Sequence, residues 1–566
     1  MSAEVRPPRP AASLVVVRDG DARWPAAGGA GRGIEVLLMM RTERGDHNSG
    51  AWVFPGGIVD RRDRDWHCCT GVDDAAISQR LALDEGGLDY AIAAIRECFE
   101  EAGVLFADDR DGQPVSPAQW QSLLEWRKPL HANERTLGEM CATAGLRLAV
   151  EGLAYIAHWL TPLGRPKRYD TRFFIAAMPE GQVVAHDDTE IVDHRWMRPA
   201  DALAQAAMLK LMTPTQAILR SIAAFGSVDA LMRHSRESRP IPRIFPRIAK
   251  GRDGARPVTP DEPSYAEIAR IDPEGRGSAS YDIQVDVPVV LSERVIRVTA
   301  NNGSVMTGPG TNAYLVRGEN DAWAVIDPGP HDPSHVDAIV AAAPGPIRWI
   351  FVTHTHVDHS PAVVRLKELT GAIALGRVAR FPDRQDPTFV PDRIPEDGER
   401  FTLGSSTKLR VVHTPGHASN HLCYLLEEEK TLFTGDHVMQ GSTVVINPPD
   451  GDMAAYLASL RALSGDPGPM LEWIAPGHGF LIEKPVDAFE KIIRHRLRRE
   501  AKVIAAIERL SDGGAVDEDS LLATVYDDVP MRMHPVARRS LAAHLIKLRD
   551  DGVAREVATA QWAIVR

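Results

Sequence analysis

The sequence is poor in cysteine, which argues against a fold held together by disulfides. Five cysteines occur in 566 residues, and none of them forms a Cys-x-x-Cys pair. An odd number of cysteines without such spacing does not build a disulfide framework. This usage favours a reducing compartment.

Long apolar runs are also missing. No stretch approaches the roughly 18 apolar residues that a membrane-spanning helix requires. Residues 1–12 are rich in Pro and Arg and lack the apolar core of a signal peptide. We therefore expect a cytoplasmic protein that makes no membrane contact.

Positive charge is in deficit. The formal net charge is -12, with 44% hydrophobic and 25% charged residues. This balance is ordinary for a globular protein and argues against nucleic-acid binding driven by the whole molecule's field, although a local basic patch stays possible. The length predicts three or four domains.

The predicted organisation is mixed α/β and multidomain. Residues 10–234 and 285–490 each alternate strand-like and helical patterns. Between them, residues 235–284 are rich in Pro, Arg and Gly, which predicts a linker; its arginines could instead contact RNA or a partner. Residues 491–566 predict helices over 491–510, 518–525 and 535–550 and then a short strand pair, as in a winged-helix domain.

One heptapeptide concentrates metal-ligand side chains. His354, His356, Asp358 and His359 lie within six residues, directly after an apolar, strand-like run at 348–352. Three imidazoles and one carboxylate at the end of a strand suit zinc or another divalent ion that prefers nitrogen and oxygen ligands.

Three further ligand candidates follow the same pattern. His417, Asp436 and His478 each end a short apolar run and stand next to a glycine. Glycine lets the backbone turn tightly and present a side chain at the edge of a sheet. The sequence therefore predicts that these residues join the heptapeptide at one edge.

Together these residues resemble the metallo-β-lactamase superfamily over 285–490, which implies an αββα sandwich. The resemblance implies two zinc or similar ions, one on His354, His356 and His417 and one on Asp358, His359 and His478. Asp436 would bridge the ions, Asp327 would orient a ligand histidine, and Asp358 would also have a catalytic role. Two such ions supply hydroxide near neutral pH, although the superfamily also includes redox chemistry on di-iron sites.

The segments 306–316 and 417–421 resemble the β-lactamase-like protein 2 group, which carries a winged-helix extension and includes endoribonucleases selective for single-stranded RNA. The heptapeptide also resembles glyoxalase II-type enzymes, which implies thioester hydrolysis. Both substrates stay open. His421 would contact substrate or protonate a leaving group, or else only support the ligands. Arg494, Arg496, Arg498 and Arg499 would contact phosphates, or form an ordinary solvated helix face.

A second constellation lies in the N-terminal part. Glu97, Glu100 and Glu101 stand at helical spacing i, i+3 and i+4, so three carboxylates share one face. Such clustering is costly without a cation, and hard oxygen ligands suit Mg²⁺ or Mn²⁺. Gly56 and Gly57 precede this helix, and Arg96 begins the acidic motif.

These residues resemble the Nudix hydrolase box, and the coenzyme A diphosphatase type with an inserted box in particular. The resemblance implies an α/β/α sandwich acting on a diphosphate of coenzyme A or a nucleotide. Arg96 would orient Glu97, and Glu97, Glu100 and Glu101 would hold Mg²⁺ or Mn²⁺ against the diphosphate. Glu100 and Glu101 would also be catalytic, and Glu190 is a candidate general base. The sequence departs from the pattern at Asp63, which replaces Glu, at Asp46, which replaces Arg, and in a spacer of 32 residues (64–95). The alternative is a non-catalytic ligand-sensing or scaffolding module.

Overall fold

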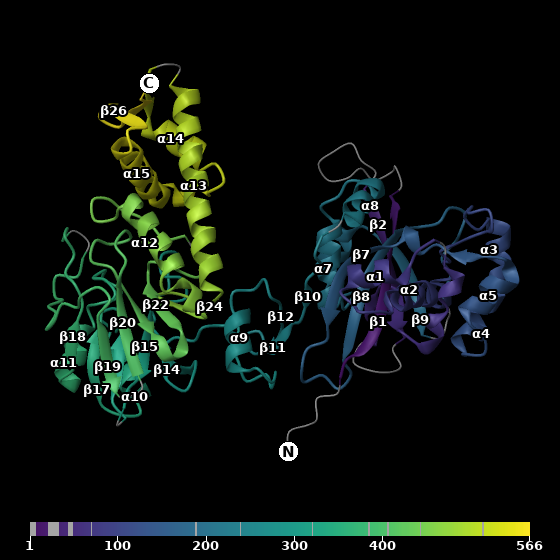
Figure 1. The fold of residues 1–566 in the computed structure, drawn as a ribbon, viewed down its shortest axis with the longest axis horizontal. Helices are drawn as coiled ribbons and strands as arrows, with labels where there is room; N and C mark the ends of the chain where they lie inside the picture. The colour runs from purple at the N-terminus through teal and green to yellow at the C-terminus, as the bar shows by residue number, and fades with distance from the viewer. Residues whose placement is uncertain are drawn as a thin grey trace. The chain divides into compact units, whose positions relative to one another are not determined.

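The computed structural model divides into two compact units, Met1–Ile248 and Ala249–Arg566. Figure 1 labels the helices and strands of each unit. The structure describes residues 7–20, 33–42, 49–69, 71–186, 190–237, 239–319, 321–382, 385–404, 407–441, 443–511 and 514–565.

The N-terminal unit is built on one mixed sheet. Its central strand, β1 (Arg9–Asp19), pairs in parallel with β8 (Tyr169–Ala177) and antiparallel with β2 (Ile34–Arg41). The strand order is β10-β7-β8-β1-β2-β3, with β4 on β1 and β9 on β2. The other strands are β3 (Trp52–Val53), β4 (Gly56–Ile58), β7 (Ala154–Leu160), β9 (Ile191–Met197) and β10 (Arg243–Ile244).

Helices cover both faces of this sheet because β1 and β2 are apolar on both faces. Leu14 and Val16 belong to the core under α2 (Gly87–Ala102), while Val15 and Val17 face α7 (Thr213–Ile222) and α8 (Val228–Arg236). Alternate side chains of a strand point to opposite faces. The predicted α/β/α sandwich is confirmed.

The remaining short elements lie mostly around α2. A helix in the predicted insertion, α1 (Asp74–Leu81), packs on α2. The others are α3 (Pro117–Leu123), α4 (Arg127–His131), α5 (Leu137–Ala144), α6 (Pro199–Ala204), β5 (Ala107–Asp108) and β6 (Arg147–Leu148).

The segment expected to be a linker contains folded structure. It carries β10, the ribbon β11 (Arg247–Ala249) and β12 (Arg256–Val258), and α9 (Tyr265–Ile271). From α9, Glu267 makes a buried two-pronged ion pair with Arg297 at 2.6 and 2.9 Å. The predicted linker segment therefore holds folded structure, because a few apolar side chains among the Pro and Arg residues build a small core of Ala249, Val258, Ile268 and Ala279.

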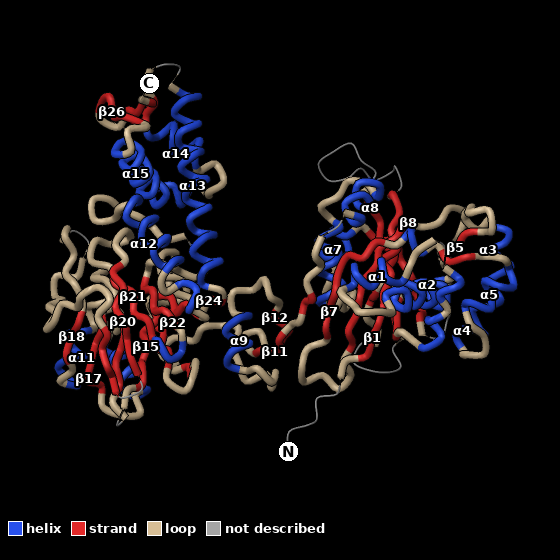
Figure 2. The backbone as a smooth tube through the Cα atoms, viewed as in Figure 1, coloured by secondary structure: helices blue, strands red, loops and turns tan. Residues whose placement is uncertain are grey.

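The C-terminal unit contains two six-stranded sheets (Figure 2). The first holds β13 (Val289–Val290), β14 (Val295–Thr299), β15 (Asn312–Arg317), β16 (Trp323–Ile326), β17 (Ile347–Phe351) and β18 (Ile373–Leu375). The second holds β19 (Arg400–Gly404), β20 (Thr407–His413), β21 (Leu422–Leu426), β22 (Thr431–Gly435), β23 (Trp473–Pro476) and β24 (Ile482–Glu483).

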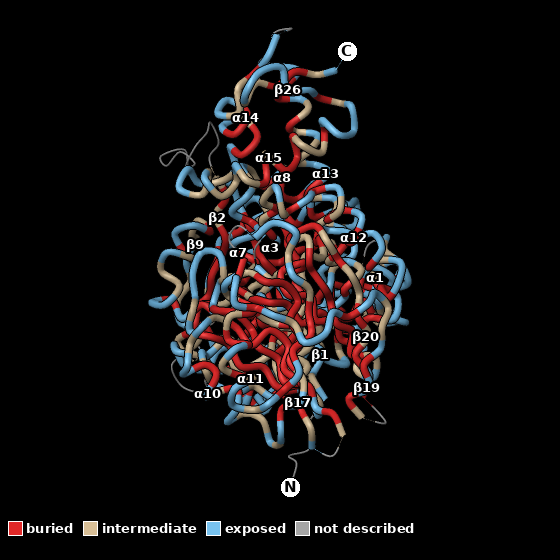
Figure 3. Tube along the Cα trace, turned by 90° about the vertical axis from the view of Figure 1, so that its left-hand side faces the viewer, coloured by how far each residue is buried: buried red, intermediate tan, exposed pale blue. Residues whose placement is uncertain are grey.

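The two sheets pack face to face over a shared core. Phe351 of the first sheet contacts Phe401 and Tyr424 of the second, edge to face. The outer faces pack against α10 (Pro333–Ala342) and α11 (Val363–Thr370) on one side, and α12 (Met453–Gly465) and α13 (Pro485–Leu510) on the other. This confirms the predicted αββα sandwich, and Figure 3 shows the buried strands.

The tail adopts the predicted winged-helix topology. It holds α14 (Glu518–Val525), α15 (His534–Asp550) and a small sheet of β25 (Val516–Asp517), β27 (Gln561–Ile564) and β26 (Ala554–Ala558). The helix predicted over 491–510 begins earlier, at Pro485. Phe489 at its start packs in the sandwich core and Ile507 near its end packs in the winged-helix core, so one continuous helix joins the two domains.

Among the described residues, no helix is both long enough and apolar enough to cross a bilayer.

Candidate metal centre

The predicted ligands meet at one edge of the two sheets because each follows a strand. His354, His356, Asp358 and His359 follow β17, and His417 follows β20. Asp436 directly follows β22, and His478 comes two residues after β23. An antiparallel bridge between Thr311 and His478 links the edges of the two sheets.

Three histidines form the first group. The ligand atoms of His354, His356 and His417 lie within 4.8 Å of one another. His356 Nδ1 is 2.9 Å from His354 Nε2 and 3.1 Å from His417 Nε2. Three ring nitrogens converging on one point provide the ligand geometry of a divalent nitrogen-preferring ion.

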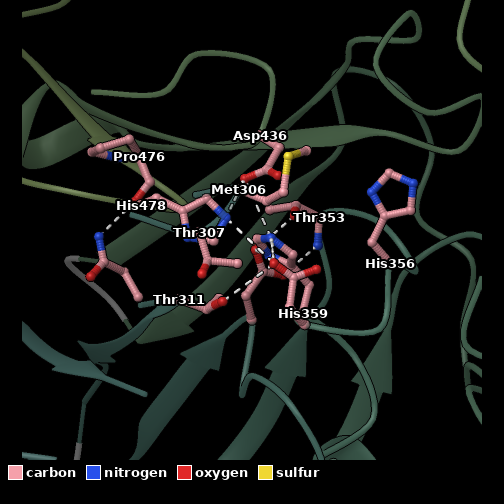
Figure 4. A network of polar contacts seen from close by, with 12 residues as sticks. Met306, Thr307, Thr311, Thr353, His356, His359, Asp436, Pro476 and His478 are labelled. Atoms are coloured by element: carbon pink, nitrogen blue, oxygen red, sulfur yellow. Dashed lines mark hydrogen bonds and ion pairs between the residues drawn. The ribbon is translucent and has the colours of Figure 1, made fainter. Parts of the chain in front are cut away.

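The second group is Asp358, His359, Asp436 and His478, again within 4.8 Å. Asp436 Oδ1 is 3.3 Å from His359 Nε2 and 3.2 Å from His478 Nε2. Its other oxygen, Oδ2, is 3.7 Å from His417 Nε2 in the first group. Asp436 therefore presents one oxygen to each group, and Figure 4 shows its side chain beside His359 and His478.

The rear nitrogens of four histidines are engaged by acceptors. His359 Nδ1 donates to Asp327 Oδ2 at 2.9 Å, and His354 Nδ1 donates to Thr353 Oγ1 at 3.0 Å. Backbone carbonyls of Val445 and Gly310 accept from His417 and His478. These contacts leave each Nε2 lone pair directed at the site, as in metal centres whose ligand orientation is fixed by outer hydrogen bonds.

Asp327 fixes the ligand strand as well as His359. Its carboxylate accepts from the Thr353 backbone N–H at 2.7 Å and from the Thr353 hydroxyl at 2.6 Å. Its backbone φ is +51°, a left-handed conformation that is uncommon for residues other than glycine. The geometry matches the predicted orienting role.

The residues fit a pair of divalent ions. His359 Nε2 and Asp436 Oδ1 are buried without a hydrogen-bond partner among the described residues. Burial raises the pKa of Asp358, but His359 and His478 outweigh it and lower that pKa to about 2. Burial lowers the pKa of His356 to about 3, with His417 adding to the effect. Deprotonated carboxylates and neutral imidazoles are the forms that bind metal.

His421 lies behind the ligand layer. Its ring is completely buried, stacks on His354 at 5.0 Å between centroids, and contacts the Thr414 hydroxyl through Nδ1 at 2.9 Å. It is not among the residues that line the cavity beside the site. This position does not fit the predicted contact with substrate or proton donation to a leaving group, because both need access; it fits the alternative of a supporting residue.

The arginine cluster on α13 is largely engaged within the protein. Arg496 is buried and donates to the backbone carbonyl of Val444. Arg499 makes a two-pronged pair with Asp528, at 2.8 and 3.0 Å, and Arg494 pairs with Glu490. Arg494 and Arg498 are exposed, so these two arginines lie on a solvated face of the helix, while Arg496 and Arg499 are engaged within the protein.

In the N-terminal unit, Arg96 is held by the residue that departs from the Nudix pattern. Its Nε and Nη2 atoms donate hydrogen bonds to the two carboxylate oxygens of buried Asp63, at 2.7 and 3.1 Å. Its Nη1 donates to Glu97 Oε1 at 2.8 Å. Asp63, although shorter than Glu, still reaches Arg96 across the long insertion. The contact with Glu97 is compatible with the predicted orienting role of Arg96.

The three predicted carboxylates share one side of α2. Glu101 accepts from the Gly56 backbone N–H at 3.0 Å, and a Cβ at Gly57 would lie 2.3 Å from a Glu97 oxygen. Burial raises the pKa of Glu101 well above its ordinary value, and Glu97 and exposed Glu190 add to the rise. Burial also raises the pKa of Glu97 and Glu100. Asp46 lies outside the described residues.

Sequence reasoning missed residues that act through tertiary contacts. Thr353 joins Asp327 to His354, and the Thr311 hydroxyl lies 3.4 Å from Asp358 Oδ2. Thr353 is the first residue of the ligand heptapeptide, 353–359, so its position beside the ligands could have indicated a supporting role. For Thr311, no local pattern in the sequence marks the contact.

Family models match three segments. Residues 306–478 match the metallo-beta-lactamase superfamily, residues 72–217 the NUDT19 Nudix domain, and residues 518–562 the beta-lactamase associated winged helix domain. The first fold implies divalent metal ions and the Nudix fold implies Mg²⁺.

Relatives and solved structures match each half. The beta-lactamase-like protein 2 homolog of Drosophila melanogaster is 32% identical over 48% of this chain and 93% of its own length. The atrochrysone carboxyl ACP thioesterase of Aspergillus chevalieri is 32% identical over 46% of this chain and 82% of its own length. A Nudix hydrolase structure from Alicyclobacillus acidocaldarius is 26% identical over 41% of this chain and 97% of its own, with a TM-score of 0.33.

The two ligand groups, the αββα sandwich and the winged-helix tail agree with these matches. The chain is a hydrolase of the metallo-β-lactamase superfamily, related to β-lactamase-like protein 2, and it carries a Nudix domain in front of the metallo-β-lactamase and winged-helix domains.

Proposed function

We propose that the C-terminal unit hydrolyses an ester or thioester at a dinuclear zinc centre. The observation that carries this proposal is Asp436, whose two oxygens face the two ligand groups. Relatives named as ACP thioesterases support the thioester over the RNA alternative. The engagement of Arg496 and Arg499 inside the protein supports the same choice, since a phosphodiester chain needs available cations.

The side chains of the centre have separate tasks. Two bound ions would acidify a water molecule and polarise the scissile carbonyl. Asp358 and Asp436 keep negative charge at the site, and Asp327 holds His359 so that its Nε2 faces inward. The near-complete burial of His354 and His359 excludes bulk water from their side of the centre.

The test is metal analysis of the purified full chain together with a side-by-side substrate assay. We expect two transition-metal ions in the C-terminal unit, and hydrolysis of acyl thioesters in preference to labelled single-stranded RNA. Fewer than two ions, or cleavage of RNA with no thioester turnover, would overturn the proposal.

We also propose that the N-terminal unit hydrolyses a diphosphate of coenzyme A or a nucleotide, with Mg²⁺ or Mn²⁺ on Glu97, Glu100 and Glu101. The supporting observation is that Arg96 is fully paired with Asp63 and Glu97 despite the altered box. Attack of water on phosphorus needs chiefly positioning and charge neutralisation, which divalent ions supply.

A panel of coenzyme A and nucleoside diphosphate derivatives tests this second activity. Glu100→Gln and Glu101→Gln should each abolish Mg²⁺-dependent turnover, while Asp229→Asn, at an exposed carboxylate of α8 on the other face of the sheet, should not change it. A wild-type protein that binds a panel member without hydrolysing it would favour the sensing module instead.

A further inference from the structure

A cavity of about 620 Å³ opens on the metal centre and continues along the winged-helix domain. Its polar end is formed by the ligands His356, Asp358, His417, Asp436 and His478. Its other wall comes from α13, η7 (Met531–Met533) and α15. The volume is that of a site for a small organic ligand.

The walls beyond the ligands are mainly apolar. The metallo-β-lactamase domain contributes Met439, Val444 and Val445, and the winged-helix domain contributes Met533 and Val536. Apolar surface in an open groove gains free energy when an apolar ligand replaces water. The groove is therefore suited to the hydrocarbon part of a substrate whose reacting carbonyl lies at the ions.

The charges along the groove do not form a track for phosphates. Arg499 forms an ion pair with Asp528. Arg496 donates a hydrogen bond to the Val444 carbonyl, and its guanidinium carbon lies 5.6 Å from the centre of the Tyr456 ring. Arg539 is the arginine of this wall that has no carboxylate or carbonyl partner among the described residues. A single free arginine on the wall favours a mostly uncharged occupant over a nucleic acid.

The winged-helix wall of the groove is held in place by helices that also pack in the sandwich core. Helix α13 runs from the sandwich core at Phe489 to the winged-helix core at Ile507, and Ala543 of α15 packs in the sandwich core. Residues on α15 and η7 are thus presented to the metal centre by packed helices, which gives the groove a defined width.

We propose that this groove binds the acyl group of the thioester, and that the winged-helix domain selects medium-length or longer apolar acyl chains. The inference rests on the proposed thioester hydrolysis and names its substrate class. Val536 and Met533 are the specificity-determining residues of the wall, and a short acyl group would leave their surface in contact with water.

The test compares octanoyl and acetyl thioesters of N-acetylcysteamine on the full chain. These compounds carry no diphosphate, so the Nudix domain has no bond to act on. We expect the wild type to prefer the octanoyl thioester in kcat/KM, and Val536→Asp to lower the octanoyl-to-acetyl ratio about tenfold or more, because the added methylenes would meet a carboxylate. Val536→Phe, which fills the groove without adding charge, should also lower the ratio. Val557→Asp, at an exposed valine of β26 outside the groove, should leave both rates unchanged.

A binding measurement separates this inference from the proposed function. S-octyl-N-acetylcysteamine is a thioether that cannot be hydrolysed, and its affinity can be measured by calorimetry. If no thioester is turned over but Val536→Asp alone weakens thioether binding, the proposed function fails and the groove assignment stands. If thioesters are hydrolysed with a ratio that none of the Val536 variants changes, or if single-stranded RNA displaces the thioether, the groove assignment is overturned.

Discussion

The two candidate centres of this chain bring metal ligands together in different ways. The N-terminal ligands are three carboxylates within five residues of one helix. The C-terminal ligands come from loops after four strands, between His354 and His478, and five of the seven are imidazoles.

This difference has electrostatic consequences. On α2, burial raises the pKa of Glu101 and of Glu97, and the Glu97 charge adds to the rise at Glu101, so these carboxylates resist ionisation until a cation arrives. In the C-terminal centre, burial acts the same way on Asp358, but His359 and His478 outweigh it and hold its pKa at about 2. Burial lowers the pKa of His478, but Asp436 and Asp358 outweigh it and raise that pKa to about 10, so this imidazole releases a proton when metal binds. Opposite charges thus stabilise the mixed ligands before metal arrives, whereas the carboxylates on α2 carry charge of one sign only.

The largest expected effect comes from removing the residue that joins the two C-terminal groups. Asp436→Ala should lower hydrolysis on the order of a thousandfold or more, since one ion loses a ligand and the pair loses its bridge. Metal analysis should show fewer than two bound ions. Asp466→Ala, which removes an exposed carboxylate paired with Arg410, is the control and should retain both. Unchanged turnover in Asp436→Ala would refute the dinuclear mechanism.

The next largest effect concerns the carboxylate centre on α2. Arg96→Met leaves Asp63 buried without its partner and should destabilise the N-terminal unit by about 3–5 kcal/mol. The measurement is the first transition in thermal unfolding of the full chain. Arg233→Met, at an exposed pair with Asp229, should shift it little. An unshifted transition in Arg96→Met would show that the pair does not support the fold.

A smaller effect is expected behind the C-terminal ligands. Asp327→Asn keeps the size of the side chain but weakens its hold on His359 and Thr353. Metal affinity should fall roughly tenfold to a hundredfold, as for other residues that orient a ligand histidine. Titration with a competing chelator measures this. Wild-type affinity would mean that packing alone orients His359.

The smallest effect concerns pH. Because the folded-state pKa of Glu101 is raised, its ionisation favours unfolding; the cost is absent below the unfolded-state pKa and grows as pH rises through the folded-state value. With chelator present, the unfolding temperature of the N-terminal unit should fall by a few degrees between pH 5 and 8. Mg²⁺ should reverse the fall, and Glu101→Gln should reduce it. A Glu101→Gln profile identical to wild type would contradict this account.

Much of the fold was predictable because its signals are local. Periodicity over 518–525 predicted α14 with the bounds that the structure has, and the apolar run at 348–352 predicted β17 to within one residue at each end. The structure within the linker was harder to predict, because Ile268 and Val258 are isolated apolar residues among prolines and arginines. They form a core only when the folded chain brings them into contact. His421 shows the same limit: its type suggested chemistry, while its burial behind His354 is a tertiary property.

The sequence by itself determined the ligand types, their strand-end positions and the acidic face of α2, because these depend on spacing along one element. Only the tertiary structure decided that Asp63 reaches Arg96 across a long insertion, that Asp436 faces both ligand groups, and that α15 forms a wall of the groove. These contacts join residues far apart in the chain, and packing of separate cores, rather than local pattern, brings such residues together.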